Sequence, residues 1–145
     1  MPVMEGKYFQ ISSLTKERVT EEIKAFLRGQ PDIIFAYLHG SFLKADRFRD
    51  IDVALFLRNP ASSTLQAEIR LETELAKVIK KFPVEIRVLN HAPLSFRYNV
   101  IKDGSVIAVL DDALRCDFVE STLRDYFDFA PFRKLYLKEA LSSGL

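Results

Sequence analysis

The sequence predicts a single α/β (α+β) domain: a sheet of about four strands, helices packed mainly on one face, and a helical C-terminal segment. Helical and strand-like hydrophobic patterns alternate along the chain. The length of 145 residues suits one domain that buries a core. No internal repeat, low-complexity run or flexible linker divides residues 1–145.

The composition is ordinary for a folded protein and carries little net charge. The chain is 48% hydrophobic and 28% charged, and its net charge of +1 does not favour direct nucleic-acid binding. A single cysteine, Cys116, excludes an intrachain disulfide and fits a reducing cytoplasm. No apolar run approaches the roughly 20 residues that a membrane-spanning helix needs. We therefore expect a cytoplasmic protein that does not enter a membrane.

The first half of the chain predicts a tail, a helix and two strands. Residues 1–10 are expected to form a loose N-terminal tail. Thr15 can cap a helix over residues 15–28, because its hydroxyl accepts from the free amides of a first helical turn. Gly29-Gln30-Pro31 ends this helix. Two apolar, β-branched or aromatic segments then predict strands over residues 32–39 and 51–57.

The second half continues the alternation. An amphipathic pattern predicts a long helix over residues 62–81, which Phe82-Pro83 stops. Strict alternation predicts a strand over residues 84–89, and Asn90 is expected to cap a helix over residues 92–102. The remaining elements are a strand over residues 105–110, a helix from 113 to about 126 opened by Asp111 or Asp112, and a last helical stretch to 141 after an interruption at Pro131.

A Gly-Ser turn at the end of the first strand is the first chemical feature. Gly40-Ser41 lies where an apolar strand stops, which is where α/β folds usually present ligand sites. Glycine lets the backbone approach a phosphate closely, and Ser41 adds a hydroxyl donor. Lys44, like Arg47 and Arg49, is near enough in sequence to meet phosphate oxygens.

Two acids follow on the second strand. Asp50 and Asp52 are two residues apart, so both carboxylates project from the same face. Their mutual repulsion would be removed by a divalent cation, and Mg²⁺ usually takes one or two carboxylates together with substrate phosphates. Glu85, on the strand over 84–89, would join this site if that strand pairs beside the Asp50–Asp52 strand in the right register.

Each feature also has a simpler interpretation. An isolated Asp-x-Asp is most often a solvated strand end, and a Gly-Ser pair is most often only a turn. Glu85 could be an exposed acid on an edge strand, paired with Arg87 or a lysine. A lone histidine at a strand end, such as His39, is more often structural. The turn and the acid pair together are much rarer than either alone, and they favour a nucleotide site.

These residues resemble the signature of the nucleotidyltransferase (polymerase β-like) superfamily, and within it the minimal nucleotidyltransferases (MNT) of HEPN–MNT toxin–antitoxin pairs. Gly40-Ser41 matches the turn of the signature, Asp50 and Asp52 match its metal pair, and Glu85 falls where a third acid belongs. The resemblance extends to the C-terminal segment around residues 124–131, and so covers nearly the whole chain. It implies a nucleotidyltransferase-like mixed sheet.

The resemblance also implies a function. It points to Mg²⁺-dependent transfer of AMP from ATP to a hydroxyl, namely a tyrosine of a HEPN-domain toxin, which this chain would silence as the antitoxin. Asp50, Asp52 and Glu85 would be catalytic and hold one or two Mg²⁺ ions, while Gly40, Ser41 and Lys44 would bind the nucleotide. Assembly into a homo-oligomer stays open.

Two departures from the family pattern concern the site. The spacer between Ser41 and Asp50 holds eight residues, fewer than usual, and lacks the common glycine after its basic residue, which here is Lys44 in place of a frequent arginine. The third acid is a glutamate rather than an aspartate, which lengthens its arm by one methylene.

Two other functions fit the same sequence. In the first, the chain is a non-catalytic antitoxin that neutralises its HEPN partner by binding. The apolar C-terminal side chains would then be either core or interface, with core the simpler interpretation: Tyr126, Phe127, Phe129, Phe132 and Tyr136. In the second, the acceptor is a small molecule, although related enzymes of that kind carry an extra helical domain.

Overall fold

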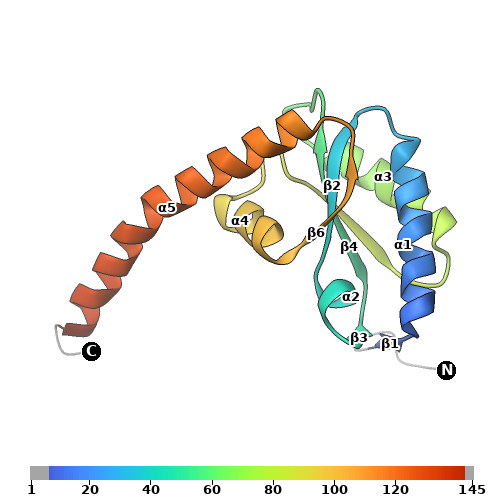
Figure 1. The fold of residues 1–145 in the computed structure, drawn as a ribbon, viewed down its shortest axis with the longest axis horizontal. Coiled ribbons are helices and arrows are strands. Elements are labelled where there is room, and N and C mark those ends of the chain that lie inside the picture. The colour runs from blue at the N-terminus through green and yellow to red at the C-terminus, as the bar shows by residue number, and fades with distance from the viewer. Residues whose placement is uncertain (1–6, 143–145) are drawn as a thin grey trace.

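The computed structural model describes the backbone of residues 7–142 and the side chains of residues 7–128. Two short strands and a four-stranded sheet alternate with helices along the chain (Figure 1). The elements in order are β1 (Phe9–Gln10), α1 (Ser13–Arg28), β2 (Ile33–His39), α2 (Ser41–Lys44), β3 (Arg47–Phe48), β4 (Ile51–Leu57), α3 (Leu65–Val78), β5 (Val84–Val88), α4 (Leu94–Asp103), β6 (Ser105–Val109) and α5 (Asp112–Ser142).

The main sheet is mixed, as the resemblance implies. Its strand order is β5-β4-β2-β6. β2 pairs antiparallel with both β4 and β6, whereas β4 pairs parallel with β5 through the crossover helix α3. The C-terminal end of β2 therefore lies beside the N-terminal end of β4, and both lie at the end of the sheet where β5 begins.

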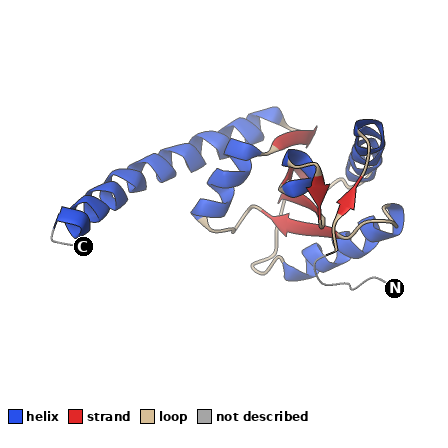
Figure 2. Cartoon of the chain, turned by 90° about the horizontal axis from the view of Figure 1, so that it is seen from below, coloured by secondary structure: helices blue, strands red, loops and turns tan. Residues whose placement is uncertain are grey.

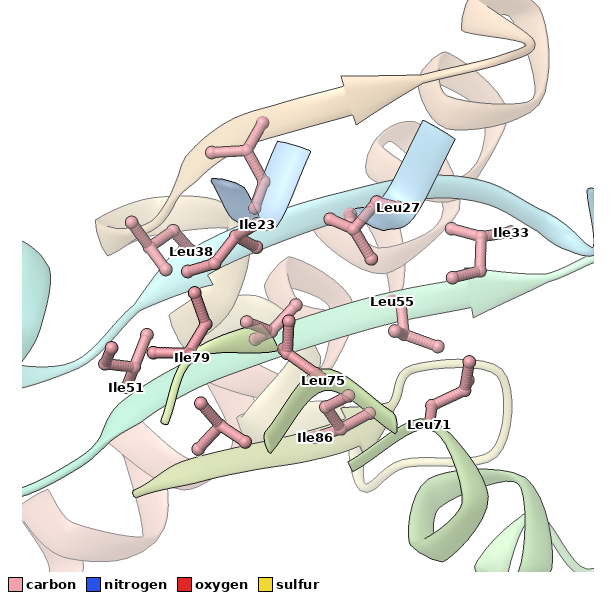
Figure 3. Close-up of a cluster of buried hydrophobic side chains, with 14 of the residues drawn as sticks. Ile23, Leu27, Ile33, Leu38, Ile51, Leu55, Leu71, Leu75, Ile79 and Ile86 are labelled. Carbon is pink, nitrogen blue, oxygen red and sulfur yellow. The ribbon is translucent and has the colours of Figure 1, made fainter. Parts of the chain in front are cut away.

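Alternate residues of the strands point to the two faces of the sheet, and each face carries its own core. On one face, α1 and α3 bury Ile23 and Leu75 against Leu55 of β4 and other apolar side chains. Figure 3 shows these side chains meeting between the helices and the strands. The apolar pattern of α1 therefore faces the larger of the two cores. The apolar pattern expected of the helix over residues 62–81 faces it only in part, because Leu65, Ile69 and Val78 are exposed.

Helices also cover the other face, which differs from the expected one-sided arrangement. Val100 of α4 and Phe118 of α5 pack with Phe35 of β2 in a second buried cluster. The Phe35 ring lies 4.9 Å from that of Phe56 and 5.4 Å from that of Phe118. The one-sided expectation was wrong because the helical pattern alone does not say which face of the sheet a helix covers.

Two predicted helix caps are replaced by neighbouring residues. Ser12, not Thr15, caps α1, and its Oγ accepts from the Thr15 amide at 3.1 Å. Asn90 does not cap α4, whose cap residue is Pro93. The Asn90 amide instead accepts from the Leu57 N–H at 2.9 Å and donates to the Leu57 carbonyl at 3.0 Å. It thereby satisfies the last backbone groups of β4.

The expected loose tail is ordered at its end. Residues 1–6 lie outside the described part of the chain, whereas β1 pairs antiparallel with β3, and Phe9 lies opposite Phe48. Phe48 is fully buried, and its ring lies 5.6 Å from Phe9 and 4.9 Å from Phe42. The spacer from Ser41 to Asp50 is therefore held against the body near its C-terminal end, where Phe48 is anchored in the core.

The outer edge of β5 is closed by two side chains of α3. The Glu72 carboxylate accepts from the Ile86 N–H at 3.0 Å, and the Glu68 carboxylate accepts from the Val88 N–H at 2.8 Å. Carboxylates on amide donors make strong hydrogen bonds, and they occupy donors that an edge strand would otherwise offer to another strand. The two glutamates therefore hold α3 and β5 in a fixed relation.

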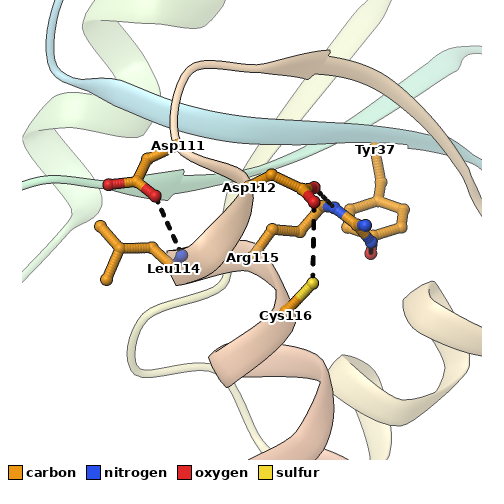
Figure 4. A network of polar contacts seen from close by, with 6 residues as sticks. All are labelled: Tyr37, Asp111, Asp112, Leu114, Arg115 and Cys116. Atoms are coloured by element: carbon orange, nitrogen blue, oxygen red, sulfur yellow. Dashed lines mark hydrogen bonds and ion pairs between the residues drawn. The ribbon is translucent and has the colours of Figure 1, made fainter.

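The C-terminal helix α5 begins against the sheet and then leaves it (Figures 1 and 2). Asp111 accepts from the Leu114 N–H at 3.1 Å, and Arg115 bonds Asp112 at 2.8 Å and the Tyr37 hydroxyl at 3.5 Å (Figure 4). The predicted interruption at Pro131 was wrong, since the helix continues to Ser142. A proline removes one helical hydrogen bond, and the turns on either side carry the helix on.

None of the described helices combines the length and hydropathy that crossing a membrane requires.

Candidate active site

The turn after β2 has a backbone geometry that only glycine adopts without strain. Gly40 has φ 80° and ψ −163°, a region that side chains exclude. A Cβ at position 40 would also collide with the Asp52 carboxylate. The main chain therefore passes directly against an acid of the neighbouring strand, and the turn has no room for a side chain.

Ser41 opens α2, a single helical turn. The Lys44 amide donates to the Gly40 carbonyl at 3.1 Å, and the Ala45 amide donates to the Ser41 carbonyl at 2.8 Å. The amides of Ser41 and Phe42 point out of the first turn, where a helix supplies no acceptor. Lys44 is the last residue of this turn and is exposed. The structure thus keeps the predicted Gly-Ser turn intact.

Lys16, which the sequence analysis did not single out, fixes the other end of α2. Its Nζ donates to the Phe42 carbonyl at 2.8 Å and to the Ala45 carbonyl at 2.7 Å. The ammonium also lies 5.3 Å from the centre of the Phe42 ring. These contacts join α1 to a turn far away in the sequence, so no local pattern could have indicated them. Lys16 positions the turn without facing the acids itself.

The three predicted acids come together at the end of the sheet where β2 ends and β4 and β5 begin. Asp52 lies opposite His39 in the β2–β4 pair and opposite Glu85 in the β4–β5 pair. Since a one-residue slip would turn a side chain to the other face, this register decides whether Glu85 can take part. Asp50 immediately precedes β4, on the same side. The structure therefore brings Asp50, Asp52 and Glu85 to one place.

The acids perturb one another. Burial, the charge of Asp50 and the contact with the Glu85 carboxyl, in that order, together raise the pKa of Asp52 to about 7. A carboxyl with acidic neighbours resists losing its proton because the charged form is repelled and poorly hydrated. A carboxyl with a raised pKa is typical of functional sites. Here the raised pKa shows that the described part of the chain places no positive charge beside Asp52 sufficient to offset its acidic neighbours.

His39 and two residues of neighbouring elements form the wall beside these acids. The His39 ring lies 5.6 Å from the Phe96 ring of α4, edge to face, and the Arg87 guanidinium lies 4.8 Å from the centre of the same Phe96 ring. The buried His39 Nε2 has no hydrogen-bond partner, and burial lowers the pKa of this imidazole. An unsatisfied buried nitrogen next to the acids suggests that the site is completed by a ligand.

The residues fit a Mg²⁺ ion that also binds phosphate. Within the described part of the chain, no three His, Cys, Asp or Glu side chains are arranged to hold a metal ion by themselves. Mg²⁺ does not require such a cage, because it commonly takes one or two carboxylates and completes its octahedron with water and substrate phosphates. Asp50 and Asp52 would supply those carboxylates, and a cation would lower the pKa of Asp52 by offsetting the repulsion that raises it.

Comparison with known proteins places this site in a family. Residues 21–113 match the family model described as polymerase beta nucleotidyltransferase, and this match spans the turn and all three acids. The chain belongs to the polymerase beta nucleotidyltransferase family. Its members transfer nucleotidyl groups, so the chain is a nucleotidyltransferase. No curated protein sequence matches the chain significantly.

Solved structures share the fold of this nucleotidyltransferase. One is a chain from the complex of a tri-AMPylated HEPN toxin with an MNT antitoxin from Shewanella oneidensis, with 20% identity, TM-score 0.67, and coverage of 87% of this chain and 98% of that one. Another comes from a toxin–antitoxin complex with AMP-PNP, with 21% identity, TM-score 0.68, and coverage of 84% and 98%. A third comes from the MntA–HepT toxin–antitoxin complex, with 19% identity, TM-score 0.66, and coverage of 86% and 98%.

Proposed function

We propose that this nucleotidyltransferase transfers AMP from ATP, with Mg²⁺, to a tyrosine hydroxyl of a HEPN toxin in the cytoplasm, and thereby acts as the antitoxin. The observation that carries the proposal is the register that sets Asp52 between the Gly40 turn and Glu85. The similar complexes support the choice of substrates, because one contains a tri-AMPylated HEPN toxin and another contains AMP-PNP.

The chain's own residues divide the work of the reaction. The Ser41 hydroxyl and the amides that open α2 hold the β- and γ-phosphates of ATP, and Lys44 adds a cation on that side. Asp50 and Asp52 would hold Mg²⁺, and the ion would supply positive charge that offsets the charge developing on the α-phosphate. Glu85, on the β5 side, contributes to the metal site or accepts the proton of the attacking hydroxyl. Positioning and electrostatics then account for most of the rate.

Intact-mass spectrometry tests the proposal directly. A HEPN toxin is incubated with ATP and Mg²⁺ together with the wild-type chain or the Asp50→Asn/Asp52→Asn variant. We expect AMP-sized mass additions with the wild type and none with the variant. Asp46→Asn is the matched control, since Asp46 is an exposed acid that lies before β3 while Asp50 follows it, and it should behave like the wild type.

The same experiment separates the two other functions. If the toxin gains no mass and the wild-type chain still neutralises it, the antitoxin works by binding, and the acids are not used. If the toxin is neither modified nor neutralised, a small-molecule acceptor becomes the hypothesis to test. Either result would refute transfer to the toxin.

A further inference from the structure

A basic pocket adjoins the acid trio at Asp50 and does not include the Gly40-Ser41 turn. Its cavity of about 530 Å³ is formed where the end of α3 meets the start of β5 and the ribbon strand β1. The Phe9 and Phe82 rings, 5.0 Å apart and nearly perpendicular, form part of its wall. The charged side chains that line it are Lys7, Arg49, Lys80 and Lys81, with Asp50 as the single acid among its lining residues.

The cations of this pocket are not neutralised by the protein. Lys80, Lys81 and Lys7 are exposed, and within residues 7–128 none of the four basic side chains makes an ion pair. Lys7 lies 5.1 Å over the Phe9 ring, and Arg49 lies 5.7 Å over the Tyr8 ring. In a chain with a net charge of only +1, this local excess attracts an anion, and the rings beside it offer an apolar surface.

The sheet order decides which reactant this pocket faces. The Gly40-Ser41 turn follows β2, on one side of β4, whereas the pocket is formed by the residues before β5, on the other side of β4. Asp50 lies between the two. In an in-line displacement the attacking and leaving oxygens lie on opposite sides of the phosphorus. Pyrophosphate that leaves toward the Gly40 turn therefore places the acceptor on the β5 side, where the pocket and Glu85 lie.

We propose that this pocket binds the phosphate of an AMP unit already attached to the acceptor, which lets the enzyme add a further unit; the proposal rests on the function proposed above. In that transfer, a ribose hydroxyl oxygen of the attached AMP bonds to the α-phosphorus of ATP. The bond from the α-phosphorus to the bridging oxygen breaks, pyrophosphate leaves, and Glu85 takes the hydroxyl proton. The phosphate held by the lysines fixes the attached nucleotide while its ribose reacts.

The binding part is tested without catalysis. AMP and, separately, inorganic phosphate are titrated into the metal-free chain with EDTA present, while NMR follows the backbone amides of Lys81, Phe82 and Gly40. We expect shifts at Lys81 and Phe82 with both probes. Lys80→Gln/Lys81→Gln should weaken this binding by about tenfold. The control Arg58→Gln/Lys77→Gln removes two charges from exposed positions outside the pocket and should leave it unchanged.

The catalytic part compares successive transfers by intact mass. Lys80→Gln/Lys81→Gln should leave the rate of the first AMP addition within about twofold and slow the second by about tenfold, because only the second acceptor carries a phosphate. Equal slowing of both additions would show that the pocket binds ATP rather than the attached AMP. NMR shifts confined to Gly40 would show that phosphate binds only at the turn. Either result overturns the inference. So does a wild type that adds one unit and stops. A wild type that adds none refutes the proposed function instead, while the NMR titration still decides whether the pocket binds phosphate.

Discussion

Asp52 concentrates the chemistry of the site in one residue. Its backbone lies opposite His39 on one side and Glu85 on the other, and its carboxylate fills the space that a side chain at position 40 would need. Its pKa of about 7 results first from burial and then from the neighbouring carboxyls of Asp50 and Glu85. A negative charge on Asp52 therefore destabilises the metal-free protein, and the same charge stabilises a bound cation.

The raised pKa predicts how stability depends on pH. Between the usual value of 3.8 and the folded value of about 7, the folded chain holds a proton that the unfolded chain has lost. The free energy of unfolding of the metal-free chain should therefore fall as pH rises from about 4 to about 7. Asp52→Asn should remove this part of the slope, and Asp46→Asn should not. Urea denaturation at pH 5 and pH 8 measures both, and an unchanged slope in Asp52→Asn would contradict the assignment.

The same pKa predicts a pH dependence of catalysis. Since Mg²⁺ and the proton compete for Asp52, activity at low Mg²⁺ should rise as pH increases through about 7. Raising the Mg²⁺ concentration should move the midpoint of this rise to lower pH. Rates of AMP transfer at several Mg²⁺ concentrations give the midpoint, and a midpoint independent of Mg²⁺ would argue that another group titrates.

Gly40→Ala should abolish activity. The positive φ would cost about 1–3 kcal/mol, and the new Cβ would displace the Asp52 carboxylate. Gly29→Ala is the control, because Gly29 has φ −82° and a Cβ there would meet the Phe26 carbonyl at 3.4 Å. Thermal melting and AMP transfer would be measured for both. An active Gly40→Ala variant would show that the close approach of the turn to Asp52 is unnecessary.

At the scale of elements, the sequence predicts the strands and helices better than it predicts how they pair and pack. The strand over 51–57 coincides with β4, and strict alternation placed β5 within one residue. The two-residue strands β1 and β3 have no periodic signal of their own, because they exist only through pairing with each other.

The candidate site was predictable to the same extent. Gly40, Ser41, Asp50 and Asp52 form a local motif that the sequence displays. Glu85 depended on an assumed register, which the parallel β4–β5 pair provides. Lys16 and Phe96 could not be found, since their contacts join elements far apart in the chain.

Lys16 provides the test at this scale. Lys16→Met keeps much of the side chain's length but loses the two hydrogen bonds that hold α2. We expect the KM for ATP to rise by about three- to tenfold with a smaller change in kcat, because two charge-assisted bonds to a half-buried loop are lost. Lys24→Met is the control, since the ion pair that Lys24 makes among the described side chains is with Glu21 on its own helix. A fall in kcat alone would mean that Lys16 acts on the chemical step rather than on the turn.

The whole molecule separates a catalytic body from a projecting helix. The described contacts of α5 with the body begin at Arg115 and include the buried Phe118 and Thr122. They continue to Tyr126 and Phe127, whose rings lie 3.6 Å and 6.3 Å from the Tyr98 ring of α4, and beyond them the helix extends away from the sheet (Figure 1). Of the apolar C-terminal side chains, Phe127 is 56% exposed, so it is not the core residue that the simpler interpretation expected. Phe129, Phe132 and Tyr136 lie outside the described side chains.

Removal of residues 129–145 should therefore leave the body folded and able to bind ATP, while binding of the toxin falls by at least about tenfold. Circular dichroism melting and nucleotide titration report on the body, and calorimetry with the toxin reports on the partner. Phe127→Ser in the full chain is the companion variant, which should weaken the toxin complex without lowering the melting temperature. Full toxin binding by the shortened chain would assign the interface to the body.

The parallel pairing of β4 with β5 also has a consequence in time. Glu85 reaches Asp52 only after the chain has formed the crossover through α3 and paired β5 with β4. Pairing of segments far apart in sequence forms late, because closing the loop between them costs conformational entropy. A newly made chain would thus have its Gly-Ser turn and aspartate pair before it has its third acid. During refolding, catalysis should return no earlier than the pairing of β5 with β4, so the appearance of activity would mark the moment when Glu85 joins the two aspartates.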